Sequence, residues 1–355
     1  MAYKLAQLQK EGIPSLLEGI LTKDDWETKR KAIMADWLDV IGDLPECDSE
    51  KVEFLAIDEE TDHVRIHLKY ETVYEDWVTA YLLVPAGVIS GKYLEVELFS
   101  TTPSKSQTPA VLALHPTEAT GKGDIALESG RANRTYGLEL VKRGFVVLAP
   151  DTITAGERIQ RGEEAFHTGR FYEQYPEWSA VAKMLVDHRQ GVSLLSKIPW
   201  VGNIGAIGHS LGGYNAYFLA GIDRRIKAVI CSAGFATFTN DPERERWGKR
   251  DWFSHMPKVS EFLTDDEVPF EFHEIAGLAA PTPLFIWIGQ NDRIFPHWKP
   301  ALDAVNDLDR LYTILGEEAS FKFYLGNVGH DFPCEIREWA YSFLDEHLQH
   351  HSFCK

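Results

Sequence analysis

The spacing of apolar residues differs between the first hundred residues and the rest of the chain. Over residues 26–41 they return every three or four positions, which predicts a helix that Gly42 ends. Residues 64–70 and 78–84 instead alternate between apolar and polar, a pattern typical of strands with one buried face. The first hundred residues therefore predict a helix followed by antiparallel strands, the second of which stops at Pro85.

Beyond the polar stretch 101–108, the apolar positions form short continuous runs separated by helix-length segments. This pattern predicts a parallel sheet whose two faces are both covered by helices. The predicted strands are 110–114, 145–149, 204–207, 228–231, 284–288 and 321–325. The predicted helices are 131–142, 178–195, 213–220, 300–315 and 333–348. We find no internal repeat or low-complexity linker, so residues 1–355 are predicted to form one α/β domain in which residues 1–100 extend the same sheet.

Two connections in this scheme, 152–177 and 235–273, are longer than a crossover requires and are rich in aromatic residues. Long connections at strand ends often form the wall or the lid of a ligand pocket. Tyr172 in the first connection and Trp252 in the second are candidate substrate contacts. The equally weighted alternative is that the aromatic residues only pack the connections onto the domain.

Composition narrows the class of protein. The chain is 44% hydrophobic and 25% charged, as in ordinary globular proteins, and its formal net charge is −18. Such a charge disfavours nucleic acid or an anionic membrane as a partner. The start lacks the apolar core of a secretory signal, and no run is long enough to span a membrane, so we expect a soluble cytoplasmic protein with a small-molecule substrate. The sequence does not decide whether the protein is a monomer or a homo-oligomer.

The four cysteines are far apart and form no C-x-x-C pair. The sequence therefore predicts reduced thiols and neither a disulfide framework nor a zinc site.

The sequence Gly208-His209-Ser210-Leu211-Gly212, followed by Gly213, carries the main chemical signal. It has the pattern Gly-x-Ser-x-Gly and lies between a predicted strand and a predicted helix. A sharp turn there exposes a serine hydroxyl, and the glycines leave room for the close approach of strand and helix. Ser210 is the candidate nucleophile; the alternative is an ordinary glycine-rich turn.

A serine nucleophile requires a base and an acid, which follow it in this order in the chain: serine, acid, histidine. His330 lies between the last predicted strand and the last predicted helix, and Asp292 lies after the strand 284–288. We predict that His330 is the general base and that Asp292 orients it. Asp331 is a rival acid, but an adjacent residue is poorly placed to meet the far ring nitrogen. The alternatives are that His330 caps its loop and that Asp292 forms a turn.

An oxyanion hole needs two amide donors. Leu211, after the nucleophile, is predicted to supply one. The loop after strand 110–114 would supply the other, but Pro116 has no N–H, so Thr117 is preferred over Glu118. The alternative is that this loop only connects a strand to a helix.

Together these residues resemble the α/β-hydrolase superfamily, and within it the branch that includes dienelactone hydrolases and acetyl xylan esterases. The segments that carry the resemblance are 26–30, 80–85, His115 with 121–122, 149–151, 156–158 and 208–213. The sequence departs from this branch at His115-Pro116, where His-Gly is usual. It also has Ser210 where dienelactone hydrolases proper have cysteine, which argues against that activity.

The resemblance implies an α/β-hydrolase fold and hydrolysis of carboxylic esters, short acetyl esters in particular, through an acyl-enzyme without cofactor or metal. It also implies that Arg158 lies at the rim of the active site, where it would contact an anionic or hydroxyl-rich substrate. The favoured alternative is an ion pair between Arg158 and Glu157 or Asp151 that holds the loop.

Two other functions are weighed against this one. A serine peptidase of the prolyl-oligopeptidase type usually carries a propeller domain, for which the residues before the parallel sheet are too few. A non-catalytic α/β-hydrolase-like binding protein would have no need of Ser210, Asp292 and His330 in this order.

Overall fold

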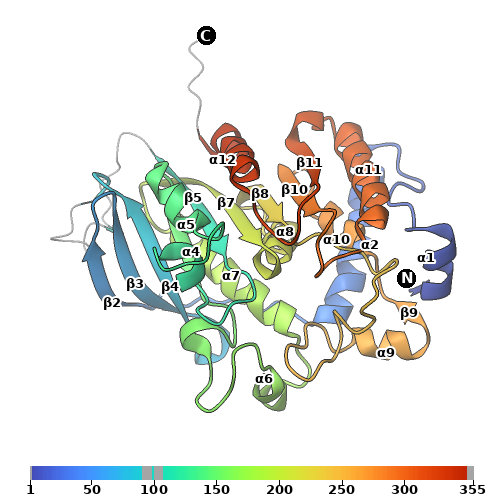
Figure 1. Cartoon of the computed structure of the whole chain (residues 1–355), viewed down its shortest axis with the longest axis horizontal. Coiled ribbons are helices and arrows are strands. Elements are labelled where there is room, and N and C mark those ends of the chain that lie inside the picture. Colours follow the sequence, from blue (N-terminus) through green and yellow to red (C-terminus); the bar gives the residue numbers. More distant parts are fainter. Residues whose placement is uncertain (1, 90–97, 100–106, 350–355) are drawn as a thin grey trace, which may run out of the picture.

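A nine-stranded sheet forms the centre of the protein in a computed structural model, which describes residues 2–89, 98–99 and 107–349 (Figure 1). The strand order is β11-β10-β8-β7-β5-β6-β4-β3-β2. The six strands from β11 to β6 are parallel to one another, whereas β4, β3 and β2 are added in antiparallel pairs. The predicted α/β class, with a mainly parallel sheet and an antiparallel N-terminal extension, is therefore confirmed.

The strands of this sheet are β2 (Val52–Glu59), β3 (His63–Glu71), β4 (Trp77–Pro85), β5 (Thr108–Leu114), β6 (Val146–Pro150), β7 (Val201–His209), β8 (Ile226–Ser232), β10 (Leu284–Gly289) and β11 (Phe321–Gly326). Strands β1 (Tyr3–Lys4) and β9 (Glu267–Val268) form a separate antiparallel pair. The sequence pattern missed β2 because a register shift between Phe54 and Ala56 interrupts its alternation. Beyond this shift Ile57, an apolar residue, is exposed at the edge of the sheet.

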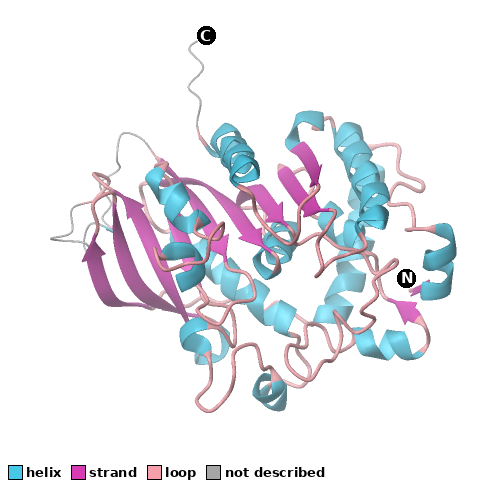
Figure 2. Cartoon of the chain, in the orientation of Figure 1, coloured by secondary structure: helices cyan, strands magenta, loops and turns pink. Residues whose placement is uncertain are grey.

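Helices cover both faces of the sheet (Figure 2). On one face lie α5 (Tyr136–Lys142) and α12 (Cys334–Leu348). The other face is covered by α2 (Lys23–Ile41), α7 (Ala180–Ser196), α8 (Leu211–Ile222), α10 (Phe272–Gly277) and α11 (Trp298–Leu315). The shorter helices are α1 (Leu5–Glu11), α4 (Gly123–Ala126), α6 (Gly169–Gln174) and α9 (Val259–Thr264), with 3-10 turns at Val73–Glu75, Gly156–Arg158 and Glu318–Ser320.

One predicted helix, 131–142, was wrong at its start. Helix α5 begins only at Tyr136, and residues 131–135 form a turn. The guanidinium of Arg131 binds Asp124 and that of Arg134 binds Asp331, so both side chains are committed to tertiary contacts. This turn borders the site described below.

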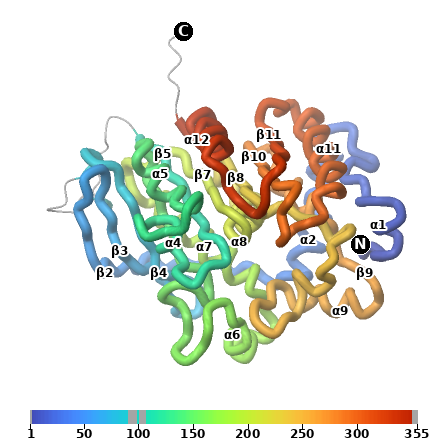
Figure 3. Tube along the Cα trace, viewed as in Figure 1, coloured from blue at the N-terminus to red at the C-terminus, as the bar shows by residue number. Residues whose placement is uncertain are grey.

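The loops that follow the parallel strands share one edge of the sheet, because the carboxyl ends of parallel strands meet there. Helices α6 and α9, from the two long connections, lie at the same end of the molecule (Figure 3). The connections also touch each other: the Tyr172 hydroxyl donates to the Ser254 carbonyl at 2.8 Å. Within the described ranges, no helix is both long and apolar enough to cross a bilayer.

Candidate active site

Ser210 occupies a strained turn between β7 and α8, with φ 56° and ψ −118°. This conformation is rare for a residue with a side chain, and it is typical of a nucleophile held at a strand-to-helix elbow. A Cβ at Gly208 would lie 2.1 Å from the Gly212 carbonyl carbon, and one at Gly212 would lie 1.9 Å from the Leu114 oxygen. The glycines are therefore required by the backbone packing of the elbow.

His330 and Asp292 meet at the edge of the sheet next to this elbow. His330 Nδ1 lies 2.6 Å from Asp292 Oδ2. The other oxygen of Asp292 accepts the amide hydrogens of Ile294 and Phe295 at 2.7 and 3.0 Å. Burial alone would raise the pKa of Asp292, but the contacts with His330 and the two amides outweigh it and lower this pKa. The carboxylate is thus ionised and fixed where it can orient the imidazole.

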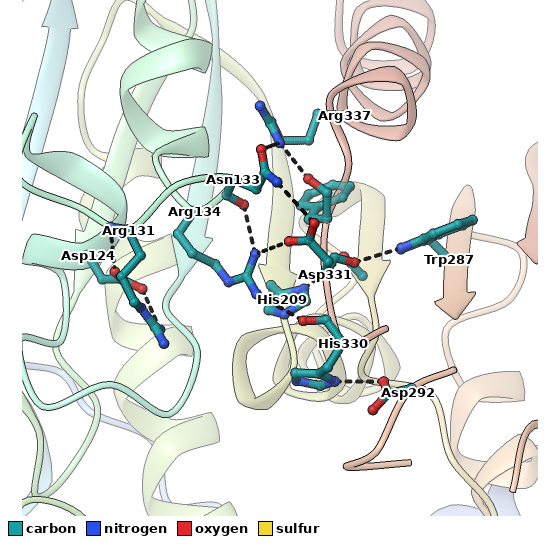
Figure 4. A network of polar contacts seen from close by, with 12 residues as sticks. Asp124, Arg131, Asn133, Arg134, His209, Trp287, Asp292, His330, Asp331 and Arg337 are labelled. Carbon is teal, nitrogen blue, oxygen red and sulfur yellow. Dashed lines mark hydrogen bonds and ion pairs between the residues drawn. The ribbon is translucent and has the colours of Figure 1, made fainter. Parts of the chain in front are cut away.

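Asp331, the rival acid, points to the other side of the histidine loop. Its carboxylate accepts hydrogen bonds from Arg134 at 2.9 Å and Asn133 at 3.0 Å (Figure 4). Asp292 is the carboxylate that contacts the imidazole.

A cavity of about 460 Å³ brings several of the candidate residues together, and Asp292 adjoins it through His330. Its lining includes Ser210, Leu211, Thr117, His330 and Trp252. No hydrogen bond joins Ser210 to His330 in this structure; such contacts often tighten only when substrate binds.

The two proposed oxyanion donors have unpaired amides. Leu211 is the first residue of α8, so its N–H has no partner within the helix. Neither this amide nor that of Thr117 donates to another of the described residues. Both belong to residues that line the cavity beside Ser210.

His115, which precedes the unusual Pro116, holds the loop that carries Thr117. The Thr152 amide donates to Nε2 of His115 at 3.0 Å, so Nδ1 must carry the ring proton and donate to the Pro116 carbonyl at 2.7 Å. Burial lowers the pKa of His115, which keeps the ring neutral. A side chain therefore fixes the peptide before Thr117.

His209, next to the candidate nucleophile Ser210, is fully buried, with its ring 4.8 Å from that of His330. Burial, reinforced by Arg134 and His330, lowers its pKa well below the usual range. A neutral ring at this position does not oppose the positive charge that a general base gains.

Sequence reasoning missed four arginines that line the cavity: Arg131, Arg134, Arg246 and Arg250. Each has a carboxylate partner, namely Asp124, Asp331, Asp241 and Glu243 respectively. They come from two segments more than a hundred residues apart, and no local motif unites them.

Two predicted substrate contacts lie elsewhere. Arg158 is 7% exposed and donates to Asp187 at 2.8 Å and to Asp76 at 2.7 Å. It forms an ion pair, as the favoured alternative expected, but with partners remote in sequence rather than with Glu157 or Asp151. The Tyr172 hydroxyl binds the Ser254 carbonyl and the Ala180 amide. Neither Arg158 nor Tyr172 lines the cavity that contains Ser210. Their contact with a substrate stays a prediction.

Of the two aromatic connections, the one at 235–273 lines the cavity, through Trp247, Trp252 and His255 among others. The connection at 152–177 contributes no lining residue and packs behind this wall, where Phe166 meets Phe253. No group of three or more His, Cys, Asp or Glu side chains is placed to hold a metal ion in the part of the chain that the structure describes.

The sequence profile of the Dienelactone hydrolase family matches residues 96–343. The chain belongs to this family. It is also 24% identical over 317 residues to "Putative hydrolase YtaP" of Bacillus subtilis (strain 168), an alignment that covers 87% of this chain and 96% of that protein. The superfamily and branch expected from the sequence are thereby confirmed.

Solved structures share the fold. A glucuronoyl esterase from Solibacter usitatus matches with a TM-score of 0.65 at 17% identity, covering 93% of this chain and 95% of that one. A "putative acetyl xylan esterase" from Bacteroides fragilis NCTC 9343 matches with a TM-score of 0.65 at 16% identity, covering 90% and 80% of the two chains. At these identities the likeness establishes the α/β-hydrolase fold.

Proposed function

We propose that this protein is a serine carboxylesterase that cleaves short acyl esters, with acetyl esters as the leading class. The observation that carries the proposal is the convergence on one cavity of Ser210, the Asp292–His330 pair and two unpaired amides. Membership of a hydrolase family supports it. The fold shared with carbohydrate esterases is consistent with an ester of a sugar or another small alcohol.

In the proposed reaction, His330 Nδ1–H donates to Asp292, which leaves Nε2 as the base for the Ser210 proton. Ser210 Oγ attacks the ester carbonyl, and the Leu211 and Thr117 amides stabilise the negative oxygen of the tetrahedral intermediate. Protonated His330 then passes the proton to the leaving alcohol, and an acyl-serine remains. Water, deprotonated by His330, attacks this acyl-enzyme, and collapse of the second intermediate releases the acid and regenerates Ser210.

The size and the lining of the cavity favour a small substrate. Trp247, Trp252 and Phe295 contribute aromatic surface to a volume of about 460 Å³, which lies in the range typical of small-molecule sites. A peptidase of the prolyl-oligopeptidase type would need room for a peptide chain.

The test is labelling with a fluorophosphonate, comparing the wild type with Ser210→Ala and with Ser342→Ala as a control. Ser342 is exposed on α12 and bonds only to the Glu338 carbonyl. We expect labelling of the wild type and Ser342→Ala, and none of Ser210→Ala. Persistent labelling of Ser210→Ala would contradict the assignment of the nucleophile.

Substrate preference is measured with p-nitrophenyl acetate, longer p-nitrophenyl esters and a peptide anilide. The proposal expects the highest kcat/KM for the acetate. A preference for the anilide would favour the peptidase, and a preference for long acyl chains would overturn the short-acyl assignment.

A further inference from the structure

Three successive carbonyl groups of the histidine loop are held by side chains from three different elements (Figure 4). The carbonyl of His330 accepts from Arg134 Nη2 at 3.1 Å, and that of Asp331 accepts from Trp287 Nε1 at 2.9 Å. The carbonyl of Phe332 accepts from Arg337 Nη1. Loop carbonyls are usually satisfied by water or by their own backbone. This loop is instead tied to the turn before α5, to β10 and to α12.

The carboxylate of Asp331 joins these ties into one network. It accepts from Arg134 Nη1 at 2.9 Å and from Asn133 Nδ2 at 3.0 Å. Asn133 Oδ1 in turn accepts from Arg337, whose Nε binds Glu139 at 2.9 Å. Burial opposes ionisation of Asp331, but the hydrogen bond and the charge of Arg134 outweigh it and lower the pKa of this carboxyl group. The network therefore contains a charge-assisted pair, which is stronger than a neutral hydrogen bond.

Arg134 is the member of this network that touches the histidine itself. Its side chain is 11% exposed, and one guanidinium binds both the carbonyl of His330 and the carboxylate of Asp331. The planar guanidinium fixes two acceptors at once, which a lysine ammonium does less well. On its other side, His330 is fixed by Asp292.

We propose that Arg134 is a positioning residue for the general base: it holds the main chain of His330 so that the imidazole faces Ser210 while bonded to Asp292. The inference rests on the proposed function, because it assigns His330 the role of the base. Displacement of a catalytic group by about 1 Å can cost on the order of 100-fold in rate. Substitution of Arg134 should consequently lower kcat.

Arg134 also lines the cavity, so direct contact with substrate is the competing explanation. Arg131 provides a matched control. It lies three residues earlier in the same turn and lines the same cavity, but its guanidinium binds Asp124 and Glu118 instead of the histidine loop. Arg131→Gln and Arg134→Gln remove the same charge from the cavity, and only the second releases His330.

The experiment measures kcat and KM with p-nitrophenyl acetate for the wild type, Arg134→Gln, Arg134→Lys and Arg131→Gln. We expect Arg134→Gln to lower kcat by about 10- to 100-fold with KM within twofold. Arg134→Lys should restore part of this loss. Arg131→Gln, which also changes the cavity lining, should affect KM more than kcat and lower kcat much less than Arg134→Gln does. The proton NMR signal of the His330–Asp292 hydrogen bond should be lost or shifted in Arg134→Gln and kept in Arg131→Gln.

Three results would overturn the inference: an unchanged kcat in Arg134→Gln, a rise in KM without a fall in kcat, or an equal loss of kcat in Arg131→Gln. If Arg134→Gln does not fold, Asp331→Asn serves instead. It weakens the pair with Arg134 and should lower kcat while leaving KM unchanged; an unchanged kcat there would also count against the inference.

The NMR comparison needs no substrate, so it distinguishes this inference from the proposed function. A wild type that neither hydrolyses esters nor is labelled at Ser210 would refute the function. A His330 signal that is identical in the wild type and Arg134→Gln would refute the positioning role.

Discussion

Two regions of this protein concentrate charged side chains, and they use them differently. Around the cavity, arginines with carboxylate partners border an open volume that also contains Ser210 and His330. Around Arg158, the partner Asp187 is 1% exposed and the nearby Lys183, which also binds Asp76, is 2% exposed. The second region borders a separate cavity of about 490 Å³, whose lining does not include Ser210 or His330. Ion pairs with the same chemistry thus border the candidate active site in one place and a cavity without Ser210 or His330 in the other.

The resemblance alone did not indicate that Arg158 pairs with Asp187 and Asp76. A residue close in sequence to a rim motif can turn its side chain inward, where burial demands a charge partner. If this comparison is right, substitutions at the cavity reduce activity, and those in the Arg158 network reduce stability.

The largest effect is expected for Asp292→Asn. The amide nitrogen would face His330 Nδ1 as a donor and favour the wrong tautomer, so kcat should fall by about 10⁴-fold. One side-chain oxygen remains to accept the Ile294 and Phe295 amides, and the melting temperature should change little. Steady-state kinetics and thermal denaturation measure the two quantities. A variant that keeps a tenth of its activity would show that Asp292 does not orient the base.

In the buried network, Arg158→Met should lower the free energy of unfolding by about 3–5 kcal/mol, because Asp187 and Asp76 lose a buried partner. The kcat/KM of the folded enzyme should stay within twofold. Urea denaturation with parallel kinetics checks both, with the exposed Arg161→Met as the control. If Arg158→Met instead kept its stability and raised KM, we would infer that Arg158 contacts the substrate.

Substitutions in the two aromatic connections, 152–177 and 235–273, should differ in their effect on KM. Trp252 is 39% exposed and lines the cavity. Trp252→Ala should raise KM about five- to tenfold through loss of roughly 1 kcal/mol of aromatic contact. Tyr172→Phe removes a hydroxyl bonded within the protein and should leave KM unchanged. Equal KM values in the wild type and Trp252→Ala would show that this wall does not contact the substrate.

The smallest effect concerns pH. Burial opposes ionisation of Asp76, but the charges of Arg158 and Lys183 outweigh it and lower its pKa from 3.8 to about 2. Because the pKa in the folded state is the lower one, the stabilisation is complete above pH 3.8 and is lost as pH falls through 2.

Asp76 is 38% exposed, so after solvent screening we expect a contribution of about 1 kcal/mol. Urea denaturation at pH 5, 3 and 2 should show a larger loss of stability in the wild type than in Asp76→Asn. Parallel pH curves would exclude this linkage.

Much of the fold could be predicted from the sequence because its signals are local. The continuous apolar runs correspond to the six parallel strands, and the helix predicted at 26–41 is the core of α2, which starts slightly earlier at a capping box of Thr22 and Asp25. Strand β2 was not predicted, because a bulge interrupts its alternation of apolar and polar residues. The start of α5 was predicted too early, because residues 131–135 form a turn held by tertiary ion pairs.

The sequence by itself determined the serine elbow and its order with Asp292 and His330. A positive φ and the backbone contacts of Gly208 and Gly212 are requirements imposed within a few residues, and strand and helix periodicities are read over similar lengths. Tertiary structure alone decided which arginine borders the cavity and which is buried among other charged groups. Arg134 binds Asp331 across 197 residues and Arg158 binds Asp76 across 82. Charged groups pair with whichever partners the folded backbone brings within about 3 Å, and chain order does not specify those encounters.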